Sequence, residues 1–324
     1  MRLRIAVKSS ARYNRSTVGI WFRAVRFHFV PPSFLPAILC TLIAWANYRV
    51  MDLEAFLLVV LGVTFNHFGL NMLDDVCDYL HFVDRQKKGD KNPYTGGSGV
   101  ITEGLLSVRQ VAVGSAVCFA VTVLIGIYLT YTKGWPVLAF GLFGLFCSIF
   151  YTLPPIKFGY RGLGEVALLV NFGPTIGLGA YYVQTGKIAI EPLMISLVLG
   201  SMMWSMIIIN EIPDYEDDRL GNKMNLVARF GKEMGITLYV AGLVLSYGIL
   251  VSSVLLRISP PIVLLGLVSL PLAVKSVRIL KKNYQDALKM VPANLSMIKV
   301  HFYTGVAMIA GYILYLFLGN MPVS

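Results

Sequence analysis

The sequence is poor in charge: Asp, Glu, Lys and Arg make up only 14% of its 324 residues. Hydrophobic residues make up 56%, and the mean hydropathy is +0.68. Charged residues normally form about a quarter of a soluble domain. The shortage of charge therefore excludes an ordinary soluble protein and indicates a chain that crosses a membrane many times.

Cysteines and acidic residues are also few. The four cysteines lie in or beside apolar segments without metal-ligand spacing, which favours buried thiols over disulfides. The basic N-terminus lacks a short apolar run that ends at a small-residue cleavage site, so no signal peptide is predicted. Lys and Arg number 28 against 17 Asp and Glu. In a membrane chain, loop orientation and anionic lipid headgroups explain this excess better than nucleic acid.

Long apolar runs are abundant. A transmembrane helix needs roughly 17–25 apolar residues. The sequence predicts an all-α polytopic membrane protein, and residues 1–324 are expected to form one transmembrane domain. Residues 17–30 mix aromatic and basic side chains and are expected to form a helix in the membrane interface. The nine predicted spans are 33–50, 53–73, 110–131, 135–153, 163–183, 190–210, 234–256, 260–277 and 300–318.

The basic residues divide unevenly between the two sides that nine spans define. One side, which includes the N-terminus, carries 24 of the 28 Lys and Arg. The other side carries only Arg49, Lys133, Lys187 and Arg257. The positive-inside rule then predicts a cytoplasmic N-terminus and an external C-terminus.

Acidic residues gather where two spans end. "NMLDDVCDYLHFVD" (71–84) follows the second span, and "NEIPDYEDDRLGNK" (210–223) follows the sixth. Both ends lie on the predicted cytoplasmic side, so the two stretches can face one another across a bundle. Each contains a pair of aspartates four residues apart on one helix face, namely Asp74 with Asp78 and Asp214 with Asp218.

This clustering points to a metal site. Closely packed carboxylates repel one another unless protons or cations neutralise them. Mg²⁺ takes oxygen ligands, often one or two carboxylates together with substrate phosphates. Because ionisable groups at a membrane edge are functional candidates, we favour this interpretation over solvated loop ends. Pro213 is expected to interrupt helical hydrogen bonding just before the second pair.

These motifs resemble those of the UbiA superfamily of intramembrane prenyltransferases. The signatures of that family are N/D-x-x-x-D with a further Asp, and D-x-x-x-D. The nearest branch is the MenA-like one, which prenylates 1,4-dihydroxy-2-naphthoate, because Asp84 follows Asp78 by six residues as that branch requires. That branch usually has Asn where this chain has Asp74. Three further stretches resemble it: "GSGVITEGLLS" (97–107), "YTLPPIKFGYRGLGEVALLVNFGP" (151–174) and "NEIPDYEDDRLGNKMNLVARFG" (210–231).

The resemblance implies nine helices around a central cavity, with a cytoplasmic-side active site. It also implies two Mg²⁺ ions that bind the diphosphate of a polyprenyl donor such as geranyl or geranylgeranyl diphosphate. The isoprenyl group passes to an aromatic or lipid acceptor in quinone or isoprenoid lipid biosynthesis. The expected metal ligands are Asp74, Asp78, Asp84, Asp214 and Asp218.

Polar neighbours of the motifs are further candidates. Asn71 and Asn210 each lie about one turn before a motif aspartate and are expected to orient carboxylates or water, although helix bridging is the alternative. Tyr151 is expected to line the cavity. His67 is interpreted as a histidine that bridges helices. Residues 95–99, "TGGSG", lack the pattern of a phosphate loop and are expected to cover the cytoplasmic mouth.

Three basic residues are candidates for the diphosphate. The resemblance favours Arg26 and Lys223 as diphosphate or acceptor contacts. Lys157 is the third candidate because it follows Tyr151, a predicted cavity residue, by six positions. The alternative for each is a loop charge that orients the chain in the membrane.

Two other protein classes use acidic membrane helices. An ion-coupled transporter binds protons or sodium at such carboxylates, but its sites lie near the bilayer midplane rather than at one end. A CDP-alcohol phosphotransferase has a D-G-x-x-A-R motif that is absent here. The acceptor remains open among dihydroxynaphthoate, hydroxybenzoate, homogentisate, a chlorophyllide and a glycerol phosphate lipid.

The charge distribution generates a topology prediction. In intact cells, Ser107→Cys and Asn222→Cys should resist a membrane-impermeant thiol reagent, whereas Ser324→Cys should react. Each variant is made in a chain whose four native cysteines are replaced by serine. Labelling of Asn222→Cys from outside would reverse the assignment.

Overall fold

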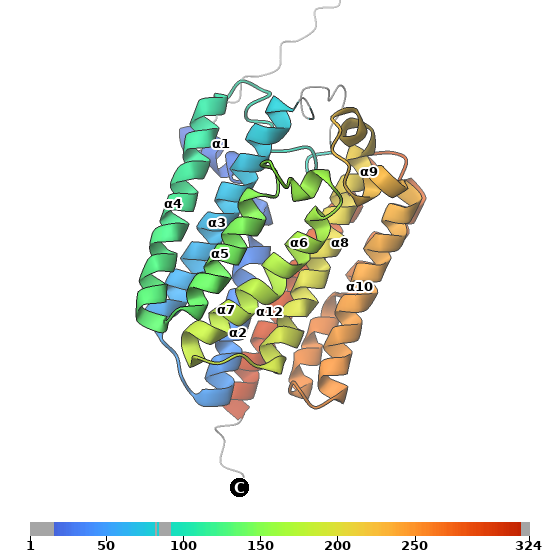
Figure 1. Cartoon of the computed structure of the whole chain (residues 1–324). Coiled ribbons are helices and arrows are strands. Elements are labelled where there is room, and N and C mark those ends of the chain that lie inside the picture. Colours follow the sequence, from blue (N-terminus) through green and yellow to red (C-terminus); the bar gives the residue numbers. More distant parts are fainter. Residues whose placement is uncertain (1–15, 82, 84–91, 319–324) are drawn as a thin grey trace, which may run out of the picture.

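The computed structural model describes residues 16–81, 83 and 92–318, so the predicted ligand Asp84 lies outside the described residues. All regular elements in this part of the chain are helices, packed side by side in an elongated bundle (Figure 1). The N-terminal helix α1 and the C-terminal end of α12 lie at opposite ends of the bundle. The predicted all-helical fold is confirmed.

The long helices follow one another through short connections. In chain order the elements are α1 Thr17–Ala24, η1 Phe27–Phe29, α2 Pro31–Tyr48, α3 Leu53–Leu80, α4 Val108–Lys133, α5 Pro136–Ile149, η3 Phe158–Tyr160, α6 Gly164–Val170, η4 Asn171–Thr175, α7 Ile176–Thr185, α8 Ile190–Leu220, α9 Leu226–Phe230, α10 Lys232–Leu255, η5 Pro261–Ser269, α11 Leu270–Asn283 and α12 Val291–Leu318.

Eight helical stretches in the described residues are long and apolar enough to cross a membrane. They correspond to eight of the nine predicted spans, with α6, η4 and α7 forming one and η5 and α11 another. The predicted span 135–153 is the shorter helix α5, which has 14 residues. The exact count of nine spans is therefore not confirmed.

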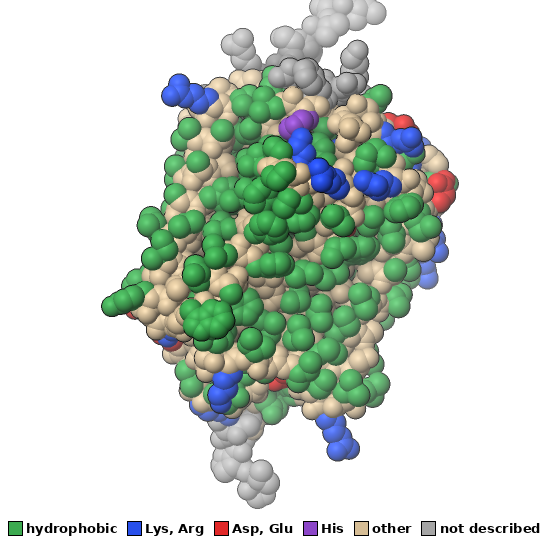
Figure 2. All heavy atoms as spheres, viewed as in Figure 1, with side chains coloured by type: hydrophobic (Ala, Val, Ile, Leu, Met, Phe, Trp, Pro, Cys, Tyr) green, Lys and Arg blue, Asp and Glu red, His purple; other side chains and the backbone are tan. Residues whose placement is uncertain are grey.

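The exterior suits a bilayer. In the view of Figure 2, hydrophobic side chains cover the middle of the bundle, and the visible Lys and Arg side chains gather toward its two ends. Large apolar side chains such as Leu124, Val244 and Phe317 are exposed, with 66–67% of their surface accessible. An apolar surface of this extent is stable in lipid rather than in water.

Helices α3 and α8 both run past the ends predicted from hydropathy. The predicted spans stop at residues 73 and 210, but α3 continues to Leu80 and α8 to Leu220. Both acidic stretches are therefore helical over most of their length. Helical geometry holds the four-residue spacing of each aspartate pair on one face.

Pro213 lies inside α8 and does not end it. Proline has no N–H, so the carbonyl of Ile209, four residues earlier, lacks its helical donor. Asn294 of α12 donates a hydrogen bond from Nδ2 to this oxygen at 3.1 Å and another to Asn210 Oδ1 at 2.9 Å. The predicted loss of a helical hydrogen bond is thus compensated by a neighbouring helix, and the helix continues.

The predicted interfacial segment forms α1 and η1 with a sharp change of direction between them. Arg26 adopts a left-handed conformation, with φ of 50°, at this point. Trp21 lies against Gly114 of α4, where an added Cβ would approach the indole ring to 2.8 Å. The segment is therefore fixed against the bundle rather than attached only by its connection.

The role of Asn294 is testable. Asn294→Ala leaves the Ile209 carbonyl and the Asn210 side chain without this donor, so the free energy of unfolding should fall by about 1–3 kcal/mol. The measurement is the apparent Tm of the purified protein in detergent. Ser296→Ala is the matched control on the same helix, because Ser296 Oγ donates only within α12, to Pro292 at 2.7 Å. Equal losses in the two variants would contradict the assignment.

Candidate active site

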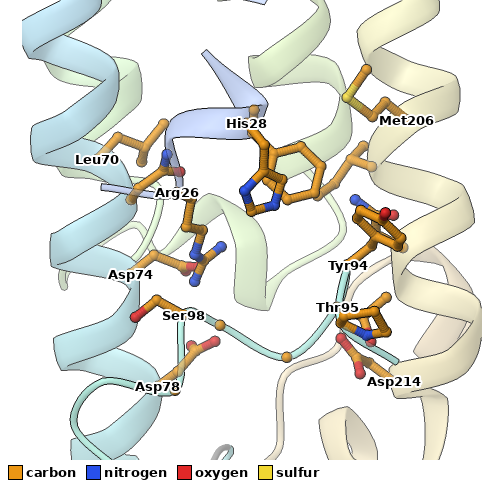
Figure 3. Close-up of a pocket in the computed structure, with 18 of the residues that line it drawn as sticks. Arg26, His28, Leu70, Asp74, Asp78, Tyr94, Thr95, Ser98, Met206 and Asp214 are labelled. Atoms are coloured by element: carbon orange, nitrogen blue, oxygen red, sulfur yellow. The ribbon is translucent and has the colours of Figure 1, made fainter. Parts of the chain in front are cut away.

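A cavity of about 860 Å³ opens at the end of the bundle where α3 and α8 terminate. Its walls combine the acidic ends of these helices with Arg26, Tyr151, Lys223 and residues 92–99. Figure 3 shows Asp74 and Asp78 on α3 opposite Asp214 on α8, with the segment around Thr95 and Ser98 passing between the two helices. The deeper wall is mainly apolar and includes Leu70, Leu168, Phe172, Met203 and Met206.

The first acidic motif is surrounded by donors. Asp78 Oδ1 accepts a hydrogen bond from the Tyr160 hydroxyl at 2.6 Å, and Asp78 Oδ2 pairs with Lys223 Nζ at 2.8 Å. Asp74 Oδ2 accepts from Arg26 Nη2 at 3.2 Å. Asp74 Oδ1 is buried without a hydrogen-bond partner in the described structure, and Lys223 Nζ lies 3.8 Å from it.

The second acidic motif follows the helical phase. Asp214 and Asp218 both line the cavity. Asp218 is buried, and its Oδ2 accepts from Asn225 Nδ2 at 2.7 Å. Asn225 Oδ1 also accepts from Ala228 N at 2.7 Å and so caps α9. Glu216, by contrast, has 74% of its side chain exposed and lies 4.0 Å from Lys232.

Two cations, Arg26 and Lys223, reach the carboxylates of α3. Arg26 pairs with Asp74 and with the adjacent Asp75. Burial lowers the pKa of the Lys223 ammonium, but Asp74, Asp78 and Asp218 outweigh that effect and hold its pKa well above the ordinary value. Lys223 is therefore a permanent positive charge at neutral pH, as the predicted diphosphate contact requires.

Residues 95–99 pass between α3 and α8 and line the cavity (Figure 3). The Ser98 N–H donates to both carboxylate oxygens of Asp75, at 3.1 and 3.2 Å, and its hydroxyl also bonds Asp75. Arg23 Nε donates to the Ser98 carbonyl at 2.6 Å. The segment contributes to the cavity lining, and its role as a cover stays a prediction. Asp75 thus holds this segment, a role that its place in the acidic run did not reveal.

Tyr151 lies in the cavity wall on a support made by two glycines. An added Cβ on Gly159 or Gly164 would approach the Tyr151 ring to 2.9 or 2.8 Å. The "GYRGLG" part of the sequence therefore has a steric function, because side chains at these two positions would displace the tyrosine.

The asparagines divide into two groups. Asn71 Nδ2 donates to the Val25 carbonyl at 3.0 Å and fixes the turn that carries Arg26. Asn210 belongs to a chain in which Asn92 donates to Asn294 at 3.0 Å and Asn294 donates to Asn210. Both predicted asparagines line the cavity. Asn92 and Asn294 were not predicted, because isolated asparagines carry no spacing signal.

Two other predicted residues occupy different surroundings. Lys157 is outside the cavity lining and lies with Nζ 2.8 Å from His81 Nε2 and 5.2 Å from the Tyr160 ring centre. His67 bridges α3 and α2 through a 2.5 Å hydrogen bond between Nδ1 and Ser33 Oγ, as predicted. It also lines the cavity and contacts the Phe172 ring edge to face.

A buried pair of glutamates was missed by the sequence analysis. Glu211 lines the cavity, and Glu165, which is 1% exposed, accepts from Leu226 N at 2.6 Å through Oε1. Each has a buried Oε2 that accepts no hydrogen bond from another described side chain or backbone group, and the two carboxyl groups interact with one another. Glu165 ends the "GLGE" stretch (162–165) and Glu211 ends "NE" (210–211). These stretches are far apart in the sequence, and nothing in their spacing indicated that the two glutamates lie together in the fold.

The carboxylate oxygens that line the cavity suit a hard cation, although they are not arranged around one common position. In residues 16–81, 83 and 92–318, no group of three or more His, Cys, Asp or Glu side chains is arranged to hold a metal ion. The carboxylates of both motifs nevertheless face one cavity, and Asp74 keeps a buried oxygen without a hydrogen bond. Oxygen ligands of this kind fit Mg²⁺, which uses few protein ligands and adds substrate phosphates.

Comparison with known proteins identifies the family. Residues 33–298 match the UbiA prenyltransferase family. The chain belongs to this family. A 1,4-dihydroxy-2-naphthoate octaprenyltransferase from Bacillus subtilis is 23% identical over 307 residues, which cover 94% of this chain and 96% of that protein. A 2-carboxy-1,4-naphthoquinone phytyltransferase from Synechocystis sp. is 29% identical over 180 residues, or 56% and 59% of the two chains.

A solved structure agrees on the fold. A UbiA homolog from Archaeoglobus fulgidus bound to GPP and Mg²⁺ matches with a TM-score of 0.62 at 15% identity, covering 92% of this chain and 99% of that one. The family assignment, the membrane location and the classification as a prenyltransferase with MenA-like relatives are thus confirmed. They support transferase activity over the transporter and phosphotransferase alternatives.

Proposed function

We propose that this UbiA-family chain acts as one transmembrane domain and transfers an isoprenyl group from a polyprenyl diphosphate to an aromatic acceptor. The observation that supports this best is the meeting of two aspartate pairs and two cations around one cavity with an apolar depth. The polar mouth matches a diphosphate, and the apolar depth matches an isoprenoid.

Magnesium is the proposed cofactor. Asp74, Asp78, Asp214 and Asp218 are the described residues that would hold it, and Asp84 is a further proposed ligand. A divalent cation supplies Lewis acidity that neutralises the diphosphate as it leaves. The name of the Archaeoglobus structure, which includes both GPP and Mg²⁺, supports this assignment.

Arg26 and Lys223 are proposed to exchange partners when the donor binds. Without substrate they neutralise the α3 carboxylates. When those carboxylates hold a cation, the two side chains can turn toward the diphosphate oxygens, where positive charge stabilises the departing group. Asn71 is proposed to position Arg26 through Val25, Asn210 to orient the end of α8, and Lys157 to contribute charge from outside the cavity.

Cleavage of the allylic C–O bond leaves a carbocation with its charge shared over the allyl group, while the bonding electron pair departs with the diphosphate. The apolar wall around Leu70, Phe172 and Met206 excludes water that would capture this cation. Tyr151 and Phe172 line the cavity, and aromatic rings can stabilise positive charge there. A pair of π electrons of the acceptor ring then forms the new C–C bond with the allylic cation. The attacked ring carbon restores aromaticity by losing either a proton, which the released diphosphate accepts, or a carboxylate group, which leaves as CO2.

The names of the Bacillus and Synechocystis relatives favour a naphthoate-type acceptor and a role in quinone biosynthesis. Geranyl and geranylgeranyl diphosphates are proposed donors alongside longer ones. The 24-to-4 distribution of Lys and Arg supports a cytoplasmic N-terminus and cytoplasmic mouth.

Helical phase supplies the sharpest test of the second motif. Asp218→Asn preserves size but removes a charged ligand, so turnover should fall at least about 100-fold, a change of about 2.7 kcal/mol. Glu216→Gln is the matched control on the same turn and should change turnover less than about threefold, since its exposed side chain points away. Both are assayed as folded, detergent-purified protein. Equal loss in both variants would exclude a metal site in this register.

Metal dependence is the second test. Chelation with EDTA should abolish binding of geranylgeranyl diphosphate, because the carboxylates alone repel its diphosphate, and added Mg²⁺ should restore it. Equilibrium binding of a labelled donor is the measurement. A metal-free affinity equal to that with Mg²⁺ would refute the two-motif metal site.

A further inference from the structure

The buried glutamates Glu165 and Glu211 have no role in the proposed diphosphate site. Glu211 precedes Asp214 and Asp218 by three and seven residues, so the three lie on one face of α8, and all of them line the cavity. At 1.5 Å per residue, Glu211 is about 4.5 Å farther from the mouth than Asp214 along the helix. Met206, deeper on α8, belongs to the apolar wall. Glu211 therefore lies where the polar mouth changes to the apolar depth.

The two glutamates form a pair that holds a proton. One carboxyl group donates a hydrogen bond to the other, which an ionised carboxylate cannot do. Glu165 is also fixed by the hydrogen bond that its Oε1 accepts from Leu226 N at 2.6 Å. Lys223, Arg229 and Asp218 act on the pair through their charges, but no described cation forms an ion pair with either glutamate. With one shared proton, the pair carries one negative charge.

The cavity side of Glu211 lacks a donor. Only 7% of its surface is accessible, and no described residue besides Glu165 donates a hydrogen bond to its carboxyl group. A buried acceptor without a donor is costly, so a bound molecule that carries an O–H group into the cavity would stabilise it.

An aromatic ring lies close to this carboxyl group. Tyr151 lines the same cavity and interacts electrostatically with both glutamates. Gly164, whose lack of a Cβ leaves room for the Tyr151 ring, directly precedes Glu165, so the start of α6 positions the tyrosine and the glutamate together. The site thus combines an aromatic surface with a hydrogen-bond acceptor, which suits an aromatic molecule that bears a hydroxyl group.

From this arrangement we infer that Glu211 binds a hydroxyl group of the aromatic acceptor and takes its proton, and that Glu165 is the positioning residue of the pair. This inference rests on the proposed function. The acceptor ring packs beside Tyr151, with its reacting carbon toward the allylic cation and its hydroxyl toward Glu211. A ring without a free hydroxyl group at this position is a poor substrate.

The proton transfer balances within one turnover. The acceptor O–H bond breaks, its electron pair stays on the oxygen, and the proton joins the glutamate pair, whose charge changes from one negative charge to none. The oxyanion releases electron density into the ring, so the ring carbon attacks the allylic cation more readily. Once that carbon has lost its proton or CO2, the ring oxygen takes the proton back from Glu211, and the pair returns to its initial state.

The first test uses the unmodified chain and the two monomethyl ethers of 1,4-dihydroxy-2-naphthoate, the acceptor in the name of the Bacillus relative. Binding of the diol and of each ether to the protein in lipid nanodiscs is measured by naphthalene fluorescence. The ether that blocks the oxygen facing Glu211 should bind at least about tenfold more weakly, because it loses a hydrogen bond to a charged group. Equal affinities of the diol and both ethers would overturn the inference.

The second test is Glu211→Gln, whose amide keeps the size of the side chain and accepts a hydrogen bond but cannot take a proton. With geranylgeranyl diphosphate and Mg²⁺, kcat should fall at least about 100-fold, within the range of general-base catalysis, while the KM for the diol changes less than about tenfold. The diol-to-ether ratio of kcat/KM should also fall at least about tenfold, which a purely steric effect of the methyl group would not produce. A kcat within about threefold of the unmodified chain would overturn the inference.

Glu191→Gln is the matched control. Glu191 is the other buried glutamate of α8 and lies outside the cavity lining, where Asn47 and Tyr312 donate to its carboxylate oxygens at 2.8 and 2.7 Å. Its kcat and KM should equal those of the unmodified chain.

Donor binding separates this role from metal ligation. The affinity for labelled geranylgeranyl diphosphate with Mg²⁺ should be unchanged in Glu211→Gln. A loss of that affinity would make Glu211 a metal ligand and overturn the inference. If the chain transferred no prenyl group, the proposed function would fail, while binding of the two ethers would still decide whether Glu211 holds the acceptor hydroxyl.

Discussion

The compensation of buried negative charge on α3 is the constraint on which the site depends. Asp74, Asp75 and Asp78 are all buried near the end of this helix. Charges removed from water are stable only with partners, and the partners come from distant segments. Arg26 lies 48 residues before Asp74, and Lys223 lies 145 residues after Asp78. These ion pairs join the N-terminal segment and the α8–α9 connection to α3. The same contacts therefore close this end of the cavity and place its charged side chains there.

The backbone obeys a similar constraint. Every carbonyl group of a membrane helix needs a hydrogen-bond donor within the protein, and Pro213 removes one helical donor beside the second motif. Asn294 replaces that donor and also binds Asn210, while Asn92 binds Asn294 from the loop that lines the cavity. The loop, α8 and α12 thus share one hydrogen-bonded network. The position of Asp214 and Asp218 relative to α3 depends on this network as well as on apolar packing.

The cavity is polar at its mouth and apolar in its depth. Its mouth carries the carboxylates, Arg26 and Lys223, and its depth carries apolar side chains as far as Phe172. Glycines allow close packing in both regions. Gly159 and Gly164 pack against the Tyr151 ring, and Gly173 packs against the backbone of α8. A diphosphate with a long hydrocarbon tail has the same order of polar and apolar parts.

The sequence by itself determined the helical membrane fold and the two aspartate pairs, because hydropathy and the 3.6-residue period act locally. Hydropathy ended the two apolar spans at residues 73 and 210, whereas α3 and α8 continue to Leu80 and Leu220, since charged turns lower hydropathy even where the chain stays helical. Only the tertiary structure decided that Asp75 holds Ser98, that Glu165 meets Glu211, that Asn294 completes α8, and that Lys157 stays outside the cavity. These pairings join residues far apart in the chain, and single polar residues carry no periodic signal that reveals their partners.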